Sequence, residues 1–160
     1  LNQWGQTRIP PELQTMQFLD VAAGYTTSYA VGYDNRLYAW GRNTFGERAI
    51  PVAAWDDVVD VAAGTNHALA LKNDGTVVAW GANDAGQSRV PAGLRDVVAI
   101  AAGDRHSLAL LDTGRVVAWG SNQFGQISKI GDPRDVVQIA AGRGTTLLLD
   151  VRGVVYPFGQ

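Results

Sequence analysis

The chain has 160 residues, of which 46% are apolar and 18% are charged, a composition that argues against a disordered protein. Thirteen basic and fifteen acidic side chains give a net charge of −2, so no surface that neutralises many phosphates and no nucleic-acid partner is expected. No apolar run approaches the length of about 18 residues that spans a membrane, and no membrane partner is expected. The chain has no cysteine, which excludes disulfides and thiolate sites and leaves the redox compartment open.

Three sequence markers recur with a common period of 39 or 40 residues. A VAAG or IAAG string ends at four glycines, Gly24, Gly64, Gly103 and Gly142. An aromatic-Gly pair follows each string and begins at Trp40, Trp80, Trp119 and Phe158. A Gly-Gln or Gly-Glu pair begins at Gly5, Gly46, Gly86 and Gly125. Three markers with one period identify a repeat protein.

Within one repeat the pattern predicts strand, turn, strand, turn, strand and loop in chain order. The third repeat shows it best: an apolar, β-branched strand over 96–103, a second strand over 106–111 and a third over 116–119. Turns of the Asp-Gly kind separate the second and third strands, and Asn35 replaces the turn glycine in the first repeat, since asparagine tolerates positive φ. A short fourth strand is expected after Gln126. No segment has a 3.6-residue apolar period, so few or no helices are expected.

Small sheets repeated at this spacing predict an all-β fold, a β-propeller with four blades in this chain, over approximately 1–41, 42–81, 82–120 and 121–160. The Ala-Ala-Gly triplets would let strands converge near a central channel, and the three tryptophans of the Trp-Gly pairs would be wedges between blades. An all-β solenoid is the competing architecture, but its repeats usually run shorter.

The units VVAIAAGDRHSLALLDTGRVVAWGSNQFGQ and VVDVAAGTNHALALKNDGTVVAWGANDAGQ resemble the regulator of chromosome condensation repeat in its compact bacterial form. The resemblance covers essentially the whole chain. It implies a propeller that acts through protein contacts, with seven blades in known members. One branch exchanges guanine nucleotides on a small GTPase and binds chromatin. The segments GQTRIP and GQSRVP are more similar to a second branch, the secreted propeller-type β-lactamase inhibitors, which favours a secreted or cell-surface location over a cytoplasmic one.

Four repeats are fewer than seven, and the chain starts at Leu1, which suggests a processed product or an excerpt. Three arrangements fit: an excerpt of a longer ring, a homodimer that closes one eight-blade ring, or a compact four-blade ring. Open ends would expose apolar blade faces, which favours pairing of two copies over the lone four-blade ring.

The sequence offers no catalytic, metal or cofactor site. His67 and His106 share a repeat position with Thr27 and Thr145, which indicates a hydrogen-bonding role that ties strand to loop. Six aspartates recur at two repeat positions, turns and strand starts, and are explained by turn chemistry: Asp34, Asp74 and Asp112 in turns, Asp60, Asp96 and Asp135 at strand starts.

Specificity in a repeat scaffold is expected where the repeats differ. One variable set follows the Ala-Ala-Gly triplet, and the other precedes the Gly-Gln pair, where three of four repeats have an aromatic residue. Aromatic and arginine side chains are the usual anchors of a protein interface, although the aromatics could instead pack between blades. The partner-binding residues we expect are Trp4, Tyr25, Phe45, Asn66, Asp104, Arg105, Phe124 and Arg143.

The leading hypothesis is therefore a non-catalytic protein-binding module, not an enzyme, that uses the variable loops of one face. The alternatives are a structural repeat protein that assembles with copies of itself and a secreted inhibitor or lectin-like binder. Guanine-nucleotide exchange ranks last, because the chain lacks the basic patches expected for chromatin binding.

Overall fold

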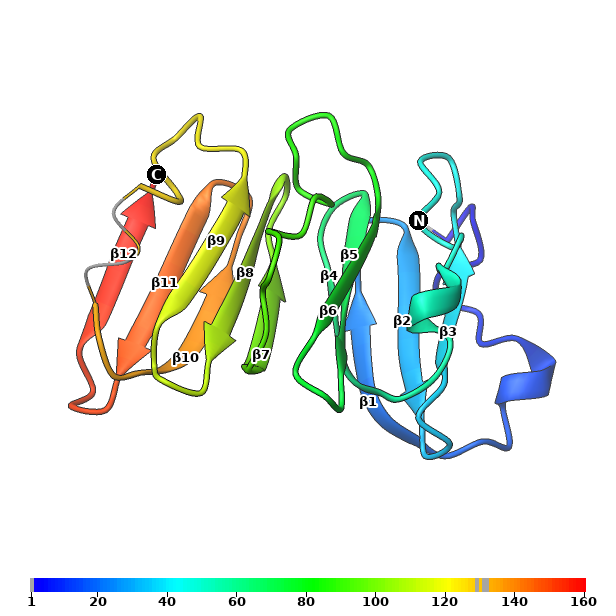
Figure 1. Cartoon of the computed structure of the whole chain (residues 1–160). Helices are drawn as coiled ribbons and strands as arrows, with labels where there is room; N and C mark the ends of the chain where they lie inside the picture. The colour runs from blue at the N-terminus through cyan, green and yellow to red at the C-terminus, as the bar shows by residue number, and fades with distance from the viewer. Residues whose placement is uncertain (1, 129, 131–132) are drawn as a thin grey trace.

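The computed structural model describes residues 2–128, 130 and 133–160. It contains four three-stranded antiparallel sheets that follow one another along the chain (Figure 1). Each sheet is named here as a blade, and its strands are ordered from the inner to the outer edge. Blade 1 consists of β1 (Phe18–Ala23), β2 (Thr27–Gly32) and β3 (Leu37–Gly41), and blade 2 of β4 (Val58–Ala63), β5 (His67–Lys72) and β6 (Val77–Gly81). Blade 3 consists of β7 (Val97–Ala102), β8 (His106–Leu111) and β9 (Val116–Gly120), and blade 4 of β10 (Val136–Ala141), β11 (Thr145–Asp150) and β12 (Val155–Gly159).

The all-β prediction and the number of blades are confirmed. Two short 3-10 helices, η1 (Pro11–Leu13) and η2 (Val52–Ala54), lie in the segments that lead into blades 1 and 2. None of the residues that the structure describes belongs to a helix long and apolar enough to cross a membrane.

The expected fourth strand does not form in the described part of the chain. The segment after the Gly-Gln pair folds into a reverse turn instead, in which the amide of Ser128 donates to Gly125 O (3.1 Å) and the amide of Arg89 donates to Gly86 O (3.0 Å). Pro51 and Pro91 then remove amide donors that a ladder would need. Each blade therefore has three strands.

The inner strands lie side by side, and their Ala-Ala-Gly triplets make this close approach possible. A Cβ on Gly64 would lie 2.4 Å from Gly103 O, and a Cβ on Gly103 would lie 2.4 Å from Gly142 O. The small residues thus have the role that the sequence predicts, since any side chain at these glycines would push neighbouring blades apart.

Three apolar clusters fill the joints between consecutive blades. The first holds Tyr29, Val61 and Trp80, the second Leu69, Ile100 and Trp119, and the third Leu108 and Leu148 with Ile139 at its edge. Trp80 and Trp119 are buried wedges, as predicted, and the Tyr29 and Trp80 rings meet edge to face with centroids 5.8 Å apart. Every joint follows one plan: an aliphatic residue of an inner strand packs against the middle strand of the preceding blade.

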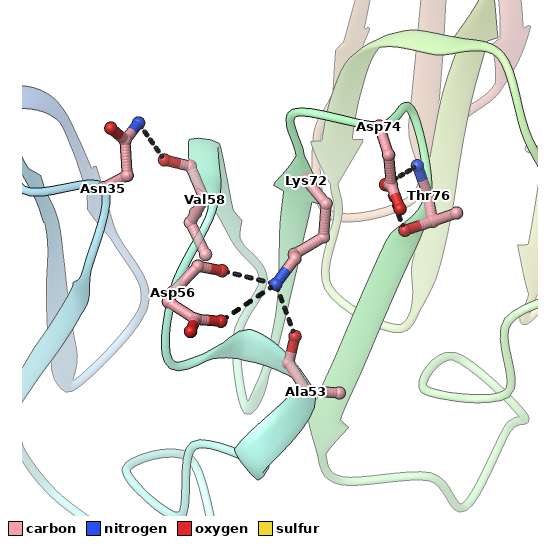
Figure 2. Close-up of polar contacts among 7 residues, drawn as sticks. All are labelled: Asn35, Ala53, Asp56, Val58, Lys72, Asp74 and Thr76. Atoms are coloured by element: carbon pink, nitrogen blue, oxygen red, sulfur yellow. Dashed lines mark hydrogen bonds and ion pairs between the residues drawn. The ribbon is translucent and has the colours of Figure 1, made fainter.

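Polar contacts reinforce the first joint (Figure 2). The amide of Val58 donates to Asn35 O (3.0 Å), and Asn35 Nδ2 donates to Val58 O (3.1 Å). Asn35 has φ of 58°, the conformation predicted for the residue that replaces the turn glycine. The Lys72 ammonium binds the carbonyls of Ala53 (3.0 Å) and Asp56 and so fastens the segment that carries η2 to blade 2.

The four blades form an open arc with blades 1 and 4 at its two ends (Figure 1). Val21 of β1 is 70% exposed, whereas the equivalent Val61 and Ile100 are 4% and 8% exposed inside joints. Leu147 of β11 is 41% exposed, whereas the equivalent Leu69 and Leu108 are fully buried. Blade 4 therefore does not cover blade 1, and the compact four-blade ring does not form.

Candidate functional site

Two loops of every blade meet at one edge of the sheet. In an antiparallel sheet of three strands, the first and third strands end at the same edge. The loop after β3 is tied to the loop after β1 by the amide of Arg42, which donates to Thr26 O (2.9 Å). The amides of Ala82, Ser121 and Gln160 make the equivalent bonds in the other blades. This edge, which carries both variable sets, is called the loop face.

The inner part of the loop face is an open hollow of about 570 Å³. The Ala-Ala-Gly triplets of all four blades form its wall, and Tyr25, Thr65, Asp104 and Arg143 stand at its rim. All four loops that follow the inner strands therefore contribute to one concave surface. The structure thus brings together Tyr25, Asp104 and Arg143, three of the residues expected to bind a partner.

The outer part of the loop face is a set of four loops with one rigid conformation. In each loop an asparagine side chain accepts the amide five residues later: Asn2 from Thr7 (3.0 Å), Asn43 from Arg48 (2.8 Å), Asn83 from Ser88 (3.1 Å) and Asn122 from Ile127 (3.1 Å). The side chain of the Gln or Glu in the Gly-Gln or Gly-Glu pair accepts the amide two residues before it, with distances of 2.7 to 3.2 Å. These bonds explain the Asn and Gln of the repeat, because both hold the loop in shape.

The residue whose amide this Gln or Glu accepts is of three types among the four loops. It is Trp4, Phe45, Ala85 and Phe124 in blade order, and the three aromatic side chains are 47%, 47% and 41% exposed. They are therefore not buried between blades. The same loop conformation therefore presents Trp, Phe or Ala to solvent at four equivalent points.

Arg42 links two of these aromatics. Its guanidinium carbon lies 5.7 Å from the Trp4 ring centroid and 5.3 Å from the Phe45 ring centroid, and its Nε donates to Thr44 Oγ1 (2.6 Å). Trp4, Arg42 and Tyr25 also line a second hollow of about 480 Å³. We call Trp4, Tyr25, Arg42 and Phe45 the aromatic cluster, a cation held between rings on the loop face of blade 1.

The loops of blades 3 and 4 differ from this arrangement. Arg105 pairs with Asp84 from the preceding loop, and Gln87 Nε2 also donates to Asp84 (2.9 Å). The Gln87 amide and the Arg105 charge hold the pKa of Asp84 below its usual range. Phe124 lies over Gly144, where a Cβ would be 2.7 Å from its ring. The expected residues Arg105 and Phe124 thus each contact a neighbour across the two variable sets, and Asn66 lies next to Thr65 with its Oδ1 buried and without a partner.

The two histidines tie blade to blade, not strand to loop as the sequence suggested. His67 Nε2 lies 3.0 Å from Ser107 Oγ, and the Ser107 hydroxyl donates to Gln87 O (2.8 Å), so the imidazole must donate to the hydroxyl. The hydrogen-bonding role of the histidines is confirmed, but their partners lie on the next blade and not in a loop of the same blade. Burial lowers the pKa of His67 to about 4, with a further contribution from His106, and burial also lowers the pKa of His106.

The expected position of Asp60 at a strand start is wrong. Asp60 is the third residue of β4, and Asp57 holds the place equivalent to Asp96 and Asp135, with φ of 55°. Asp60 lies beside Asp20, and Asp20 Oδ2 accepts the amide of Val61 across the first joint (3.0 Å). Burial, followed by the hydrogen bond and charge of Asp20, raises the pKa of Asp60 to about 6. The pair belongs to the joint between blades and is not part of the loop face.

Sequence reasoning missed Arg42 and Asp84. Both occupy repeat positions that vary, and this variation was the signal that could have found them. Ala82 and Ser121 stand where Arg42 does, directly after a Trp-Gly pair, and Thr44 and Gln123 stand where Asp84 does. Among the described residues, no group of three or more His, Asp or Glu side chains is arranged to hold a metal ion.

Comparisons with known proteins agree with this architecture. Prp20p from Saccharomyces cerevisiae has a TM-score of 0.73 and 27% identity, over 95% of this chain and 45% of that chain. The ectodomain of the receptor kinase CR4 from Physcomitrella patens has a TM-score of 0.79 and 19% identity, over 99% of this chain and 45% of that one. Human WBSCR16 has a TM-score of 0.76 and 19% identity, over 91% and 50%. At 19% identity the last two show the fold alone.

The chain spans about half the length of these solved structures. Comparison with curated protein sequences finds no match. The sequence model of the regulator of chromosome condensation (RCC1) repeat matches residues 18–47, 58–87 and 97–126. These segments begin with the inner strands of blades 1 to 3 and end with the Glu or Gln that fixes each outer loop. The chain therefore belongs to the regulator of chromosome condensation (RCC1) repeat family.

Proposed function

We propose that this chain is a non-catalytic protein-binding module whose binding surface is the loop face. One observation carries the proposal: four loops share one hydrogen-bonded conformation, yet the residue at the same position of that loop is Trp in one, Phe in two and Ala in one. A loop conformation that repeats while one exposed residue varies suits a binding scaffold. Loops that hydrogen bonds already hold in shape lose little entropy when a partner binds.

The chemistry of the loop face supports a protein as the partner. Exposed aromatic side chains and arginines are the residue types that contribute most to protein interfaces, and this face has Trp4, Tyr25, Phe45 and Phe124 together with Arg42 and Arg143. Tyr25 is 74% exposed, more than any other tyrosine in the described chain. A free surface does not usually gather this many exposed rings without a partner.

A similar protein of known structure binds other proteins. Yeast RCC1 (Prp20) has been crystallised with Kap60 bound, and Prp20p was studied for its binding to Gsp1p and histones. This supports a protein partner for the present chain without naming it. The residues expected from the sequence to bind a partner are proposed here together with Arg42. The full set is Trp4, Tyr25, Arg42, Phe45, Asn66, Asp104, Arg105, Phe124 and Arg143.

The test compares two quadruple alanine variants. The loop variant replaces Trp4, Phe45, Arg105 and Phe124, and the control variant replaces exposed residues away from the loop face, Val52, Trp55, Val98 and Val137. Both are immobilised beside the unchanged chain and exposed to purified probes, namely a β-lactamase, a small GTPase and core histones, and to lysate of the source cells.

The proposal predicts at least one protein whose affinity is kept by the control variant and lowered on the order of 100-fold or more by the loop variant. Equal capture of every bound protein by the loop variant and the unchanged chain would refute it.

A further inference from the structure

The two ends of the arc carry the two halves of a joint that the chain forms three times internally. We propose that two copies of this chain close one ring, with blade 4 of each copy packed against blade 1 of the other. This inference is independent of the partner that the loop face binds.

The apolar residues at the two ends match those inside the joints. Blade 4 exposes Leu147 (41%) and Val155 (55%), where blade 3 has Leu108 and Val116, which are 0% and 7% exposed against blade 4. Blade 1 exposes Val21 at its other end. The end faces therefore differ from the internal faces in exposure and not in residue type.

The polar groups at the ends match as well, and they fix the direction of pairing. Inside the chain, the amide of Val97 donates to Gly75 O and the amide of Val136 donates to Gly114 O (both 3.1 Å). The equivalent groups at the ends are the amide of Phe18 and the carbonyl of Gly153. They lie on opposite ends of the arc, so blade 4 of one copy and blade 1 of another would bring such a pair together in a head-to-tail association.

Polar side chains at the two ends of the arc also match those that meet inside the joints. Asp20 accepts the amide of Val61 across the first joint, and Gln138, whose amide oxygen can also accept, stands at that position in blade 4. Ser28 occupies the place of Ser107 and Thr146, whose hydroxyls lie 3.0 Å from the histidines of the preceding blade. Thr145 takes the histidine position in blade 4 and would face Ser28 of the second copy.

Gly142 gives independent support for a second copy packed against blade 4. A Cβ on Gly24, Gly64 or Gly103 would collide with a carbonyl of the next blade at 2.4 to 2.7 Å. A Cβ on Gly142 would find no atom nearer than 3.9 Å, so nothing within the chain requires glycine there. The carbonyl that would require it is Gly24 O of a second copy.

Two head-to-tail joints related by a twofold axis close the ring, and closure leaves no apolar blade face uncovered. Closure also completes the loop face, because the Tyr25 loop of one copy becomes the neighbour of the Arg143 loop of the other.

The experiment measures the mass of the 160-residue chain in solution by light scattering, at concentrations up to about 100 µM. The proposal predicts twice the 17.1 kDa of one chain. Val21→Glu and Leu147→Lys, one at each end, should each give a folded monomer by circular dichroism. The matched control Val52→Glu changes a valine that is also 70% exposed but lies on η2, away from both ends, and should remain dimeric.

An equimolar mixture of Val21→Glu and Leu147→Lys then tests the direction of pairing. The mixture contains one unaltered joint and one joint in which Glu meets Lys, so dimers should reappear. Gly142→Ala should fold and weaken the dimer at least tenfold in Kd. A monomeric unchanged chain, or dimers that survive both end variants, would overturn the proposal, and dimers lost in only one of the two would show pairing of like ends instead.

Discussion

His106 Nε2 lies 3.0 Å from Thr146 Oγ1 on the next blade, and His67 Nε2 lies at the same distance from Ser107 Oγ one blade earlier. Each imidazole rests on a glycine, since a Cβ on Gly103 or Gly64 would lie 2.2 or 2.3 Å from its Cε1. At the first joint the equivalent positions hold Thr27 and Ala68, and no such bond spans the blades. A histidine on one blade and a hydroxyl side chain on the next therefore occur together, and the hydrogen bond between them joins the two blades.

The buried His67 of this hydrogen bond makes the stability of the fold depend on pH. The pKa of His67 is about 4 in the folded chain and about 6.5 in an unfolded one, so between these values only the unfolded chain binds the proton. The contribution of His67 to the free energy of unfolding is present above pH 6.5 and is lost as pH falls toward 4, at about 1.4 kcal/mol per pH unit. His67→Thr, which copies blade 1, should make urea unfolding less dependent on pH between 7 and 5. An unchanged dependence would contradict the account.

Asp60 has the opposite effect on how stability changes with pH. Its pKa of about 6 in the folded chain lies above the ordinary value of 3.8, so its ionisation costs stability at pH 7, and this cost disappears as pH falls from about 6 to below 4. Asp60→Asn should raise the free energy of unfolding at pH 7 by about 1–2 kcal/mol, once solvent screening of the half-buried group is allowed for. The gain over the unchanged chain should vanish near pH 3.5. A variant that is less stable at pH 7 would show that the carboxylate supports the joint.

Glu47 is a buried departure from the glutamine of the other repeats. Its Oε2 accepts the amide of Phe45 (2.7 Å), while its Oε1 is buried with no hydrogen-bond partner. Glu47→Gln keeps the acceptor that holds the loop and removes a poorly satisfied carboxylate, so it should stabilise the chain by about 1–3 kcal/mol. Thermal unfolding at pH 7 measures this, and Gln87→Glu should show the reverse change. A destabilised Glu47→Gln would mean that Oε1 has a function that the glutamine cannot replace.

The indole N–H groups fasten each blade to the loop before it. Trp119 Nε1 donates to Gln87 O (2.9 Å), as Trp80 does to Glu47 O (2.7 Å), and blade 4 has Phe158 at this position. Trp119→Phe should therefore fit sterically and cost about 1–3 kcal/mol through one lost bond to a buried carbonyl and lost ring area. Phe158→Trp is the converse substitution. Chemical denaturation of both variants checks this, and a Trp119→Phe variant as stable as the unchanged chain would contradict it.

The sequence was sufficient for the blades but not for their ends. Three strands per repeat and the joints between blades follow from the period, because apolar β-strands spaced this way can bury both faces only against each other. The fourth strand was predicted where the chain instead makes the turn that closes on Gly125 O, since a polar segment of a few residues before a proline gives no strand periodicity to read. Repeats of equal composition also carry no information on which faces remain open, so the exposure of Val21 and Leu147 had to come from the structure.

The loop face was predicted from its variable positions, whereas its contacts were not. Trp4 and Phe45 were expected to bind a partner, but the contact of both rings with Arg42 depends on how loops 41 residues apart approach in space. The register of Asp60 was misread because aspartate also occurs at Asp57, three residues earlier, and the strand bulge near Val58 separates the two. Such errors arise where several positions of one repeat hold the same residue type.

Amide hydrogen exchange, measured with and without the captured partner, tests the claim of a loop-face binding module most directly. If the loop face binds the partner, exchange should slow in the segments 25–26, 42–46, 82–86 and 122–125. It should not change in the turns at the opposite edge, 33–36, 73–76 and 112–115. Protection confined to those turns, with the loop segments unaffected, would contradict it.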